Sequence, residues 1–393
     1  MLVGDAQWSS QLQRRWRQLR LTVRVLSSRQ RLALATACLL LLCLWGWPRP
    51  PAESVLHPRT PSLLPRIGFA HRIHSDRQQL SPQQARIRVS SESFAQYGTD
   101  ERGLHYRLEN DELLENENNR AQDSVLAIVV LNDAASWGEQ RTVEDFFRLL
   151  QSFSYPQHKM SVAMLTSSKS EFDRIQQVMQ HAISQYAQLT LLYRSDFNMD
   201  ERLNRENRHQ HALQTARRRM LARYRNFALL STLQPWHQHV VWIDADVHRI
   251  PSDLLSRMIM LDRDILEPIC LRDKADKSGT YEYDLNAWVG RRKTPSLWQS
   301  RSDFVPGDLS IQRMAQYRNG PDDVVPLDSV GGTMLYVRAD VHRQGVLFPH
   351  HHIVGSEWEG EGYDGIETEG LCYAAHFLGF RCWGLPHDAI FHV

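Results

Sequence analysis

The sequence predicts an α/β domain with a mixed, mostly parallel sheet flanked by helices, beginning near residue 124. Residues 125–131 read VLAIVVL, an unalternating apolar run of strand length, which is typical of a strand buried on both faces of a parallel sheet. From there to residue 243, strand and helix patterns alternate. Because such repeats with right-handed crossovers build doubly wound sheets, we expect that architecture here.

The hydrophobic patterns predict the individual elements. An amphipathic helix is expected over 142–153, which ends before Tyr155-Pro156. A second helix begins at Ser170, whose side chain suits a helix cap, and a long Arg-rich helix is expected over 200–230. The other predicted elements are strands at 160–165, 189–193, 239–243, 264–271 and 380–385, a strand that begins after the two glycines in 330–337, and a helix at 371–378.

The average composition hides an uneven distribution of charge. The 393 residues carry 46 basic and 45 acidic side chains, with a mean hydropathy of −0.46. Residues 1–31 hold seven arginines against one acid, a local charge of +6 that leaves −5 for the rest. A mildly acidic body argues against nucleic acid as a partner, since binding a polyanion requires a basic surface. No two of the five cysteines have the C-x-x-C spacing of a zinc or redox site.

An uncharged stretch of sixteen residues, 32–47, follows the arginine cluster. It is shorter than the ~20 residues of a typical membrane span, but flanking arginines can snorkel and its tryptophans suit the interface. Because positive charge stays cytoplasmic, we expect a type II signal anchor with a cytosolic tail at 1–31. A cleaved signal peptide or a buried core helix are the alternatives. Bulky residues at the end of the run and the absence of a polar face disfavour them.

Residues 48–123 are expected to form a flexible lumenal stem. Seven of the chain's 17 prolines lie between Pro48 and Pro82, without a sustained hydrophobic period. Such a stretch cannot bury enough surface to fold alone. The following residues to 122 are polar and increasingly acidic, and we expect them to be partly helical. This assigns 124–393 to the folded domain.

The predicted strand 239–243 runs directly into Asp244-Ala245-Asp246. Ligands of doubly wound sheets bind at the carboxyl ends of strands, and two carboxylates spaced this way can share one divalent cation. The chemistry that most often needs this arrangement neutralises a nucleotide diphosphate with Mg²⁺ or Mn²⁺. A haloacid-dehalogenase-type phosphatase is an alternative, because Asp244 to Val247 fits its D-x-D-x-[TV] pattern. However, that nucleophile follows the first strand of its domain, whereas three predicted strands precede Asp244.

Three downstream segments contain residue types common in sugar sites. Residues 281–288 mix aromatics with carboxylate and amide groups, which stack on sugar rings and bind their hydroxyls; a polar loop with buried tyrosines is the alternative. Two glycines in 330–337 allow a ligand or another strand to approach the backbone closely. Residues 357–370 form a loop of glycines and acids before the last helix. For Asp364 and Glu367 in this loop we expect a role in binding the acceptor.

From about residue 125 onward, the chain resembles the fungal mannan-polymerase mannosyltransferases (glycosyltransferase family 62). The segments that carry the resemblance are ARRRMLARYRNF (216–227), VVWIDADV (240–247), YDLNAW (283–288), VGGTMLYVRADVHRQGVLFP (330–349) and WEGEGYDGIETEGLC (358–372). The resemblance implies a GT-A fold, which binds a nucleotide-diphospho-sugar, in a type II Golgi membrane protein with a lumenal catalytic domain. It further implies retaining transfer of mannose from GDP-mannose to a mannan or N-glycan outer chain, in α-1,6 or similar linkage.

The resemblance also implies a metal and a leaving-group site. Asp244 and Asp246 would hold Mn²⁺ (or Mg²⁺), with His392 as the third protein ligand, a role that suits imidazole. A guanidinium from Arg217, or from a neighbouring arginine on the same predicted helix, would add a second positive contact to the diphosphate.

The remaining candidate residues bind the two sugars. Asp284, together with Asn286, would bind the donor mannose, and Asp284 could instead steady an oxocarbenium-like transition state. Asp364, Glu367 and Trp358 would bind the mannose oligosaccharide acceptor, with one of the two acids orienting its hydroxyl.

Two features remain open at this point. Members of the resembling family assemble into complexes, so we expect a hetero-oligomer with related subunits. A mainly non-catalytic scaffolding subunit is therefore the alternative, although a scaffold would not need the aspartate pair or His392. Cys372 and Cys382 bracket the last predicted helix, where a disulfide and a reduced buried pair are equally compatible with the sequence.

Overall fold

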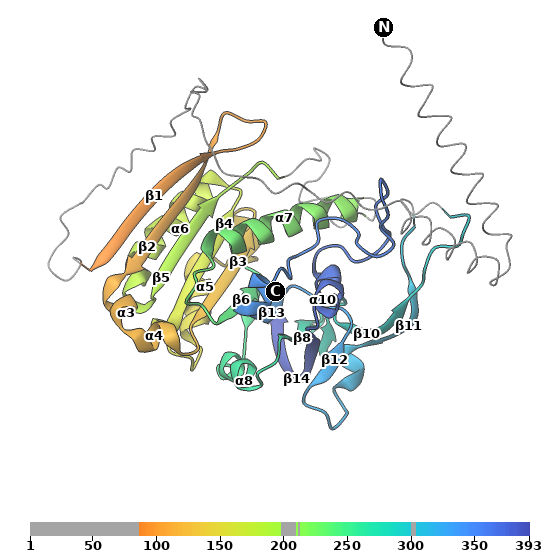
Figure 1. The fold of residues 1–393 in the computed structure, drawn as a ribbon. Coiled ribbons are helices and arrows are strands. Elements are labelled where there is room, and N and C mark those ends of the chain that lie inside the picture. Colours follow the sequence, from red (N-terminus) through yellow and green to blue (C-terminus); the bar gives the residue numbers. More distant parts are fainter. Residues whose placement is uncertain (1–85, 198–209, 211–212, 300–303) are drawn as a thin grey trace, which may run out of the picture. The chain divides into compact units, whose positions relative to one another are not determined.

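The computed structural model describes residues 86–197, 210, 213–299 and 304–393 (Figure 1). The predicted cytosolic tail at 1–31, the anchor at 32–47 and the proline-rich part of the stem lie outside these residues. Within them, no helix has the length and hydropathy to cross a membrane.

The described residues form one mixed sheet, a separate two-stranded sheet, and helices on both faces of the large sheet (Figure 1). The strands of the large sheet are β1 (Ile87–Ala95), β2 (Arg102–Asn110), β3 (Val125–Leu131), β4 (Met160–Thr166), β5 (Gln188–Tyr193), β6 (His239–Ile243), β7 (Val247–Arg249), β8 (Ile265–Asp273), β9 (Thr280–Glu282), β12 (Val325–Leu327), β13 (Met334–Arg338) and β14 (Cys382–His392). The small antiparallel sheet consists of β10 (Trp288–Arg292) and β11 (Asp308–Arg313).

The α-helices are α3 (Asp111–Glu115), α4 (Glu117–Ala121), α5 (Val143–Gln151), α6 (Lys169–Ala182), α7 (Gln214–Thr232), α8 (Leu254–Met260), α9 (Ala339–Arg343) and α10 (Thr368–Phe377). Short 3-10 turns are η1 (Ala134–Trp137), η2 (Gln157–Lys159), η3 (Ile183–Gln185) and η5 (Met314–Tyr317).

The prediction of an α/β domain is confirmed, with a sheet that is parallel in one part and mixed in the other. The strand order is β1-β2-β5-β4-β3-β6-β13-β8-β14-β12, with β7 beside β14 and β9 beside β8. The strands β5, β4, β3 and β6 run parallel, as the alternating pattern predicts. Beyond them, β13 runs antiparallel to both β6 and β8, while β8 and β14 are parallel.

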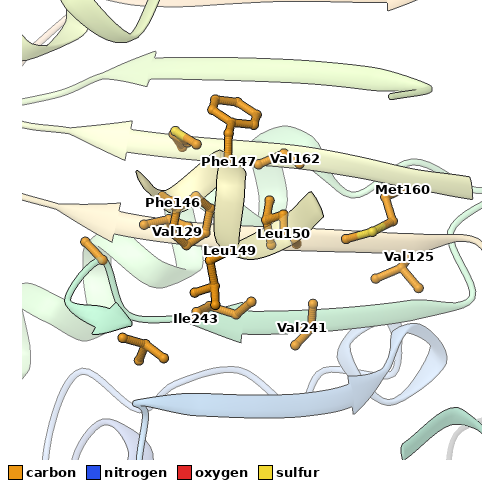
Figure 2. Close-up of a cluster of buried hydrophobic side chains, with 14 of the residues drawn as sticks. Val125, Val129, Phe146, Phe147, Leu149, Leu150, Met160, Val162, Val241 and Ile243 are labelled. Carbon is orange, nitrogen blue, oxygen red and sulfur yellow. The ribbon is translucent and has the colours of Figure 1, made fainter. Parts of the chain in front are cut away.

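The central strand β3 is buried on both faces, which explains its unbroken apolar sequence. Val125 and Val129 belong to the core beneath α5 and α6, and Figure 2 shows Val129 beside Phe146 of α5. Leu126 and the other alternate residues belong to a second core with α7. Two cores on opposite faces of one sheet are the structural basis of a doubly wound fold.

The folded region begins earlier than the predicted boundary at residue 124. Residues 87–110, which the sequence places in the stem, form the hairpin of β1 and β2, and β2 pairs antiparallel with β5. In β2, Leu108 is 1% exposed and so contributes to the core. The sequence does not reveal this hairpin because nearly all of β1 faces solvent, which leaves it without a hydrophobic period.

Two other element boundaries differ from the prediction in ways that affect the site. Residues 330–333, with the two glycines, precede the strand β13, as predicted. The last strand extends to His392 and does not end near residue 385. The Arg-rich helix begins at Gln214 within the described residues.

Candidate functional site

The pairing of the last strand with β7 brings two of the predicted metal ligands, Asp246 and His392, into contact. Asp244 and Asp246 follow β6, and in the next strand Val247 pairs with His392 of β14. The His392 Nε2 atom lies 2.9 Å from Oδ2 of Asp246. The ring of His392 also stacks on Tyr283, with ring centroids 3.8 Å apart. Burial by itself lowers the pKa of His392, but the contact with Asp246 outweighs it and raises that pKa.

Asp244 lies in the same cluster but bonds to a different partner. Its Oδ1 atom accepts a hydrogen bond from the Arg225 guanidinium at 3.3 Å. Burial raises the pKa of the Asp244 carboxyl, and the nearby Asp246 and Asp284 raise it further, while Arg225 opposes them. Asp246 and Asp284 thus add negative charge near Asp244 at this end of β6.

The donor chemistry of this cluster fits a divalent cation. Two carboxylates and an imidazole are ligands that suit Mn²⁺, and carboxylates also suit Mg²⁺. Burial, the main cause, and the neighbouring carboxylates raise the pKa of Asp244, and a bound cation would oppose both effects. In the described part of the chain, no three His, Cys, Asp or Glu side chains converge into a preformed metal site. Asp246 and Asp244 instead bond to His392 and Arg225.

Asp284 lies in the loop after β9 and is fixed by backbone and hydroxyl donors. Its Oδ2 atom accepts hydrogen bonds from the Gly332 N–H at 3.0 Å and the Thr333 hydroxyl at 2.9 Å. Its Oδ1 atom accepts from the backbone N–H of Asn286 at 3.2 Å. The predicted donor residues Asp284 and Asn286 are thus neighbours, and Asn286 fixes Asp284 through its backbone.

The two glycines before β13 make room for charged side chains of the site. A Cβ atom on Gly331 would lie 1.9 Å from Oδ2 of Asp284, and one on Gly332 would lie 2.4 Å from Nη1 of Arg225. The sequence predicts that these glycines allow a ligand or a strand to come close. In the structure they allow the side chains of Asp284 and Arg225 to come close.

Arg225 is a site residue that sequence reasoning missed. It is 7% exposed, and it donates to Glu367 at 2.5 Å and to the Gly332 carbonyl at 3.4 Å, in addition to Asp244. The predicted arginine, Arg217, lies about two turns earlier on the same helix, α7. The available signal is helical spacing, because Arg225 shares the buried face of α7 with alanine and leucine side chains. An arginine at a core position of a helix indicates a buried carboxylate partner.

Glu367, one of the two acids predicted to bind the acceptor, is buried, and both of its carboxylate oxygens accept hydrogen bonds. Its Oε1 atom accepts from Arg225, and its Oε2 atom accepts from the Thr368 hydroxyl at 3.1 Å. Its backbone has a φ of 59° before α10, a left-handed conformation that is strained for a residue with a Cβ atom. Glu367 therefore stabilises the Arg225 side of the site.

Asp364 and Trp358, the other two predicted acceptor residues, line a cleft of about 860 Å³. The first half of α7 and the segment 304–306 form its other walls. Trp358 is 92% exposed at the rim, while Asp364 is 3% exposed. The structure thus places both residues in one cleft.

Partly buried ion pairs connect the walls of this cleft. Arg292 contacts Asp364 at 3.1 Å and Glu369 at 3.2 Å, and Arg218 contacts Glu369 at 2.6 Å. Burial raises the pKa of Asp364, although Arg292 opposes the effect. Glu369, in the first turn of α10, links both arginines.

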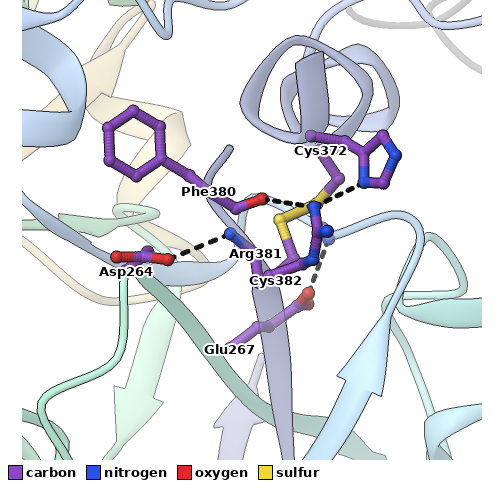
Figure 3. The surroundings of a disulfide bond; sticks show 8 residues. Asp264, Glu267, Cys372, Phe380, Arg381 and Cys382 are labelled. Atoms are coloured by element: carbon purple, nitrogen blue, oxygen red, sulfur yellow. Dashed lines mark hydrogen bonds between the residues drawn. A yellow bond between two sulfur atoms is a disulfide. The ribbon is translucent and has the colours of Figure 1, made fainter. Parts of the chain in front are cut away.

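The question left open for the last two cysteines is resolved in favour of a disulfide. Cys372 of α10 and Cys382 of β14 form it (Figure 3). The bond joins the helix that follows the Glu367 turn to the strand that ends in His392.

Comparison with known families now identifies the chain. Residues 104–352 match the family model described as Anp1. This chain belongs to the Anp1 family. The match to the Anp1 family includes Asp244, Asp246, Asp284 and Arg225, while the cleft loop with Trp358 and the terminal strand lie beyond it.

Individual relatives agree with the Anp1 assignment. Mannan polymerase complex subunit mnn9 of Schizosaccharomyces pombe is 27% identical over 271 residues, which cover 64% of this chain and 77% of that protein. The mannan polymerase II complex anp1 subunit of the same yeast is 30% identical over 270 residues, covering 63% of this chain but only 60% of that protein. Among solved structures, a mannosyltransferase of Pyrobaculum calidifontis in complex with GDP-Man and Mn²⁺ gives a TM-score of 0.39 at 14% identity, covering 68% of this chain and 56% of that one.

Proposed function

We propose that this chain is a metal-dependent, retaining mannosyltransferase that moves mannose from GDP-mannose to a mannose oligosaccharide of an α-mannan or N-glycan outer chain, in α-1,6 or similar linkage. The observation that carries the proposal is the cluster of Asp244, Asp246, His392 and Asp284 at the carboxyl end of β6. It occurs in an Anp1-family chain whose relatives are named as mannan polymerase subunits. Family membership favours this function over the phosphatase.

Asp244, Asp246 and His392 would hold Mn²⁺ or Mg²⁺, which when bound would offset the negative charge of the departing GDP. Arg225 holds Asp244 in place, because its guanidinium contacts both Asp244 and Glu367. Arg217 is our candidate for a contact to the diphosphate.

Asp284 is suited to the donor sugar because its carboxylate is preorganised. The hydrogen bonds from Gly332, Thr333 and Asn286 fix its orientation before any ligand binds. A fixed carboxylate can accept hydrogen bonds from sugar hydroxyls or stabilise positive charge that develops on the sugar, without a cost for reorganisation in the transition state.

Asp364 is the acid best placed to orient the acceptor hydroxyl. It lines the cleft with Trp358, whose exposed ring offers a face on which a sugar can stack. Glu367 has both carboxylate oxygens bonded to Arg225 and Thr368. We therefore assign Glu367 to the support of the site and Asp364 to the acceptor.

We further propose that the chain is a single-pass type II protein of the Golgi membrane and works in a hetero-oligomer with related mannosyltransferase subunits. The basic tail, the apolar segment 32–47 and the names of the relatives support this. The second candidate function, a scaffolding subunit, is favoured by the same names, because each relative is described as part of a complex.

The test uses the full chain, purified in detergent and supplied with GDP-mannose, Mn²⁺ and α-mannobiose. Mannosylated product from the chain alone is expected, and linkage analysis then identifies the bond. Asp284→Asn should lower kcat/KM for GDP-mannose by about 100-fold, since removing one electrostatic contact to a transition state has effects of this size. Absence of product from the chain alone, together with product when a related subunit is added, would support the scaffold instead.

A further inference from the structure

Glu267 is a buried acid that the mechanism above does not use. It lies on β8 between β13 and β14, and only 1% of its surface is exposed. Its Oε2 atom accepts a hydrogen bond from the Gly331 N–H at 2.7 Å. Its Oε1 atom has no hydrogen-bond partner among the described residues. Figure 3 shows Glu267 close to Cys382, consistent with the pairing of β8 with β14.

The contact with Gly331 connects Glu267 to the donor site. The N–H of Gly331 points to Glu267, and the next two N–H groups, of Gly332 and Thr333, point to Asp284. Gly331 itself packs directly on the Asp284 carboxylate. One three-residue segment is therefore held on one side by Glu267 and fixes Asp284 on the other.

The charge of Glu267 is compatible with this position. Burial raises its pKa well above the usual value, Asp284 and Glu282 raise it further, and the Gly331 N–H opposes them. The Cys270 thiol on the same strand is also influenced by Glu267. The raised pKa favours the neutral form of the carboxyl, which can accept the Gly331 hydrogen bond without placing a second negative charge beside Asp284.

We propose that Glu267 is a positioning residue of the donor site, which holds the Gly331–Thr333 segment and, through it, the Asp284 carboxylate. The inference rests on the proposed function, because it assumes that Asp284 binds the donor. Substitution of Glu267 should affect the donor and not the acceptor, because no hydrogen bond among the described residues links Glu267 to the cleft residues Trp358 and Asp364.

Glu267→Gln and Glu267→Leu in the full chain test the proposal. The amide of Gln can still accept from Gly331, so kcat/KM for GDP-mannose should stay within about threefold. Leu cannot accept, so the same constant should fall at least tenfold, a factor that corresponds to the loss of one hydrogen bond, while KM for α-mannobiose changes less than twofold. Glu267→Asp shortens the side chain and should have the same kinetic effect as Glu267→Leu. It replaces Glu267→Leu in the test if that variant does not fold.

Glu171→Leu is the matched control. Glu171, on α6, is 3% exposed, and its carboxylate accepts a hydrogen bond from the Trp137 indole N–H at 2.7 Å. It lies far from Glu267 in the sequence. The Glu171→Leu variant should lose stability as Glu267→Leu does, but its kinetic constants for GDP-mannose should stay at the wild-type values. Equal kinetic losses in both variants, or unchanged donor kinetics in Glu267→Leu, would overturn the proposal.

Hydrogen exchange provides a readout independent of transfer activity. The amides of Gly332 and Thr333 should be protected in the wild-type chain and in Glu267→Gln, and exchange at least tenfold faster in Glu267→Leu. Unchanged protection in Glu267→Leu would refute the positioning role. If exchange responds as expected but the wild-type chain transfers no mannose, the proposed function fails while the positioning of Asp284 by Glu267 stands.

Discussion

Gly331→Ala should disable the donor site by displacing a single side chain. A Cβ atom at position 331 would lie 1.9 Å from Oδ2, 2.2 Å from Cγ and 2.5 Å from Oδ1 of Asp284. A relaxed contact between carbon and oxygen needs about 3.3 to 3.6 Å, so the carboxylate must move by roughly 1.5 Å. Because Gly331 does not have the left-handed backbone that favours glycine, the effect is steric and not conformational.

The size of the effect follows from the contacts that Asp284 loses. Moving the carboxylate breaks its hydrogen bonds with Gly332 and Thr333, and overpacking a tight site costs about 1–3 kcal/mol. We expect a loss of about 2 kcal/mol in the free energy of unfolding, since the displaced, partly exposed carboxylate can be solvated. A misplacement of about 1 Å in a reacting site can reduce the rate about 100-fold. We expect a fall of that order in kcat/KM for GDP-mannose.

Transfer kinetics and urea unfolding of the full chain provide the measurement. Gly307→Ala is the control, because its Cβ atom would meet only the Lys293 Cδ atom at 3.9 Å, an ordinary contact. The control should match the wild-type chain in both assays. A Gly331→Ala protein whose kcat/KM stays within twofold of the wild-type value would refute the assignment of Asp284 to the donor site.

Three further predictions concern buried charge, pH and the acceptor. Arg225→Lys cannot reach both Asp244 and Glu367 and should lower the free energy of unfolding, measured by thermal unfolding, by about 3 kcal/mol. Arg219→Lys, which keeps a positive charge beside Glu361 and only weakens that exposed pair, should lower it by less than about 1 kcal/mol. Burial lowers the pKa of His342 to about 4, so stability present above pH 6.5 should fall by about 3 kcal/mol as the pH approaches 4. Urea unfolding of His342→Gln should show a shallower pH dependence. Trp358→Ala should raise KM for α-mannobiose about fivefold, since aromatic stacking contributes about 1 kcal/mol, and leave KM for GDP-mannose unchanged.

The elements with strong hydrophobic patterns could be predicted from the sequence. The strand 125–131 is buried on both faces, and its unbroken apolar run follows directly from that position. The β1–β2 hairpin could not be predicted in the same way. Most of β1 is exposed, so nothing in its sequence separates it from a polar stem until its pairing with β2 is known.

The candidate site was predictable to a similar degree. The position of Asp244 and Asp246 after a buried strand is a local feature, and the parallel strands fix it. The partners of this pair depend on contacts between distant segments. His392 reaches Asp246 through the pairing of β7 and β14, and Arg225 reaches Asp244 from α7. Glu267 is apparent only once its burial and its contact with Gly331 are known.

The central claim is that the aspartate pair supports transfer from GDP-mannose. The most direct measurement compares the wild-type chain with the double variant Asp244→Asn with Asp246→Asn, using GDP-mannose, Mn²⁺ and α-mannobiose. Asp253→Asn, at the start of α8, is the control for loss of a carboxylate outside the site. We predict Mn²⁺-dependent product from the wild-type and control chains and none above background from the double variant. Full GDP-mannose-dependent transfer by the double variant would contradict the account.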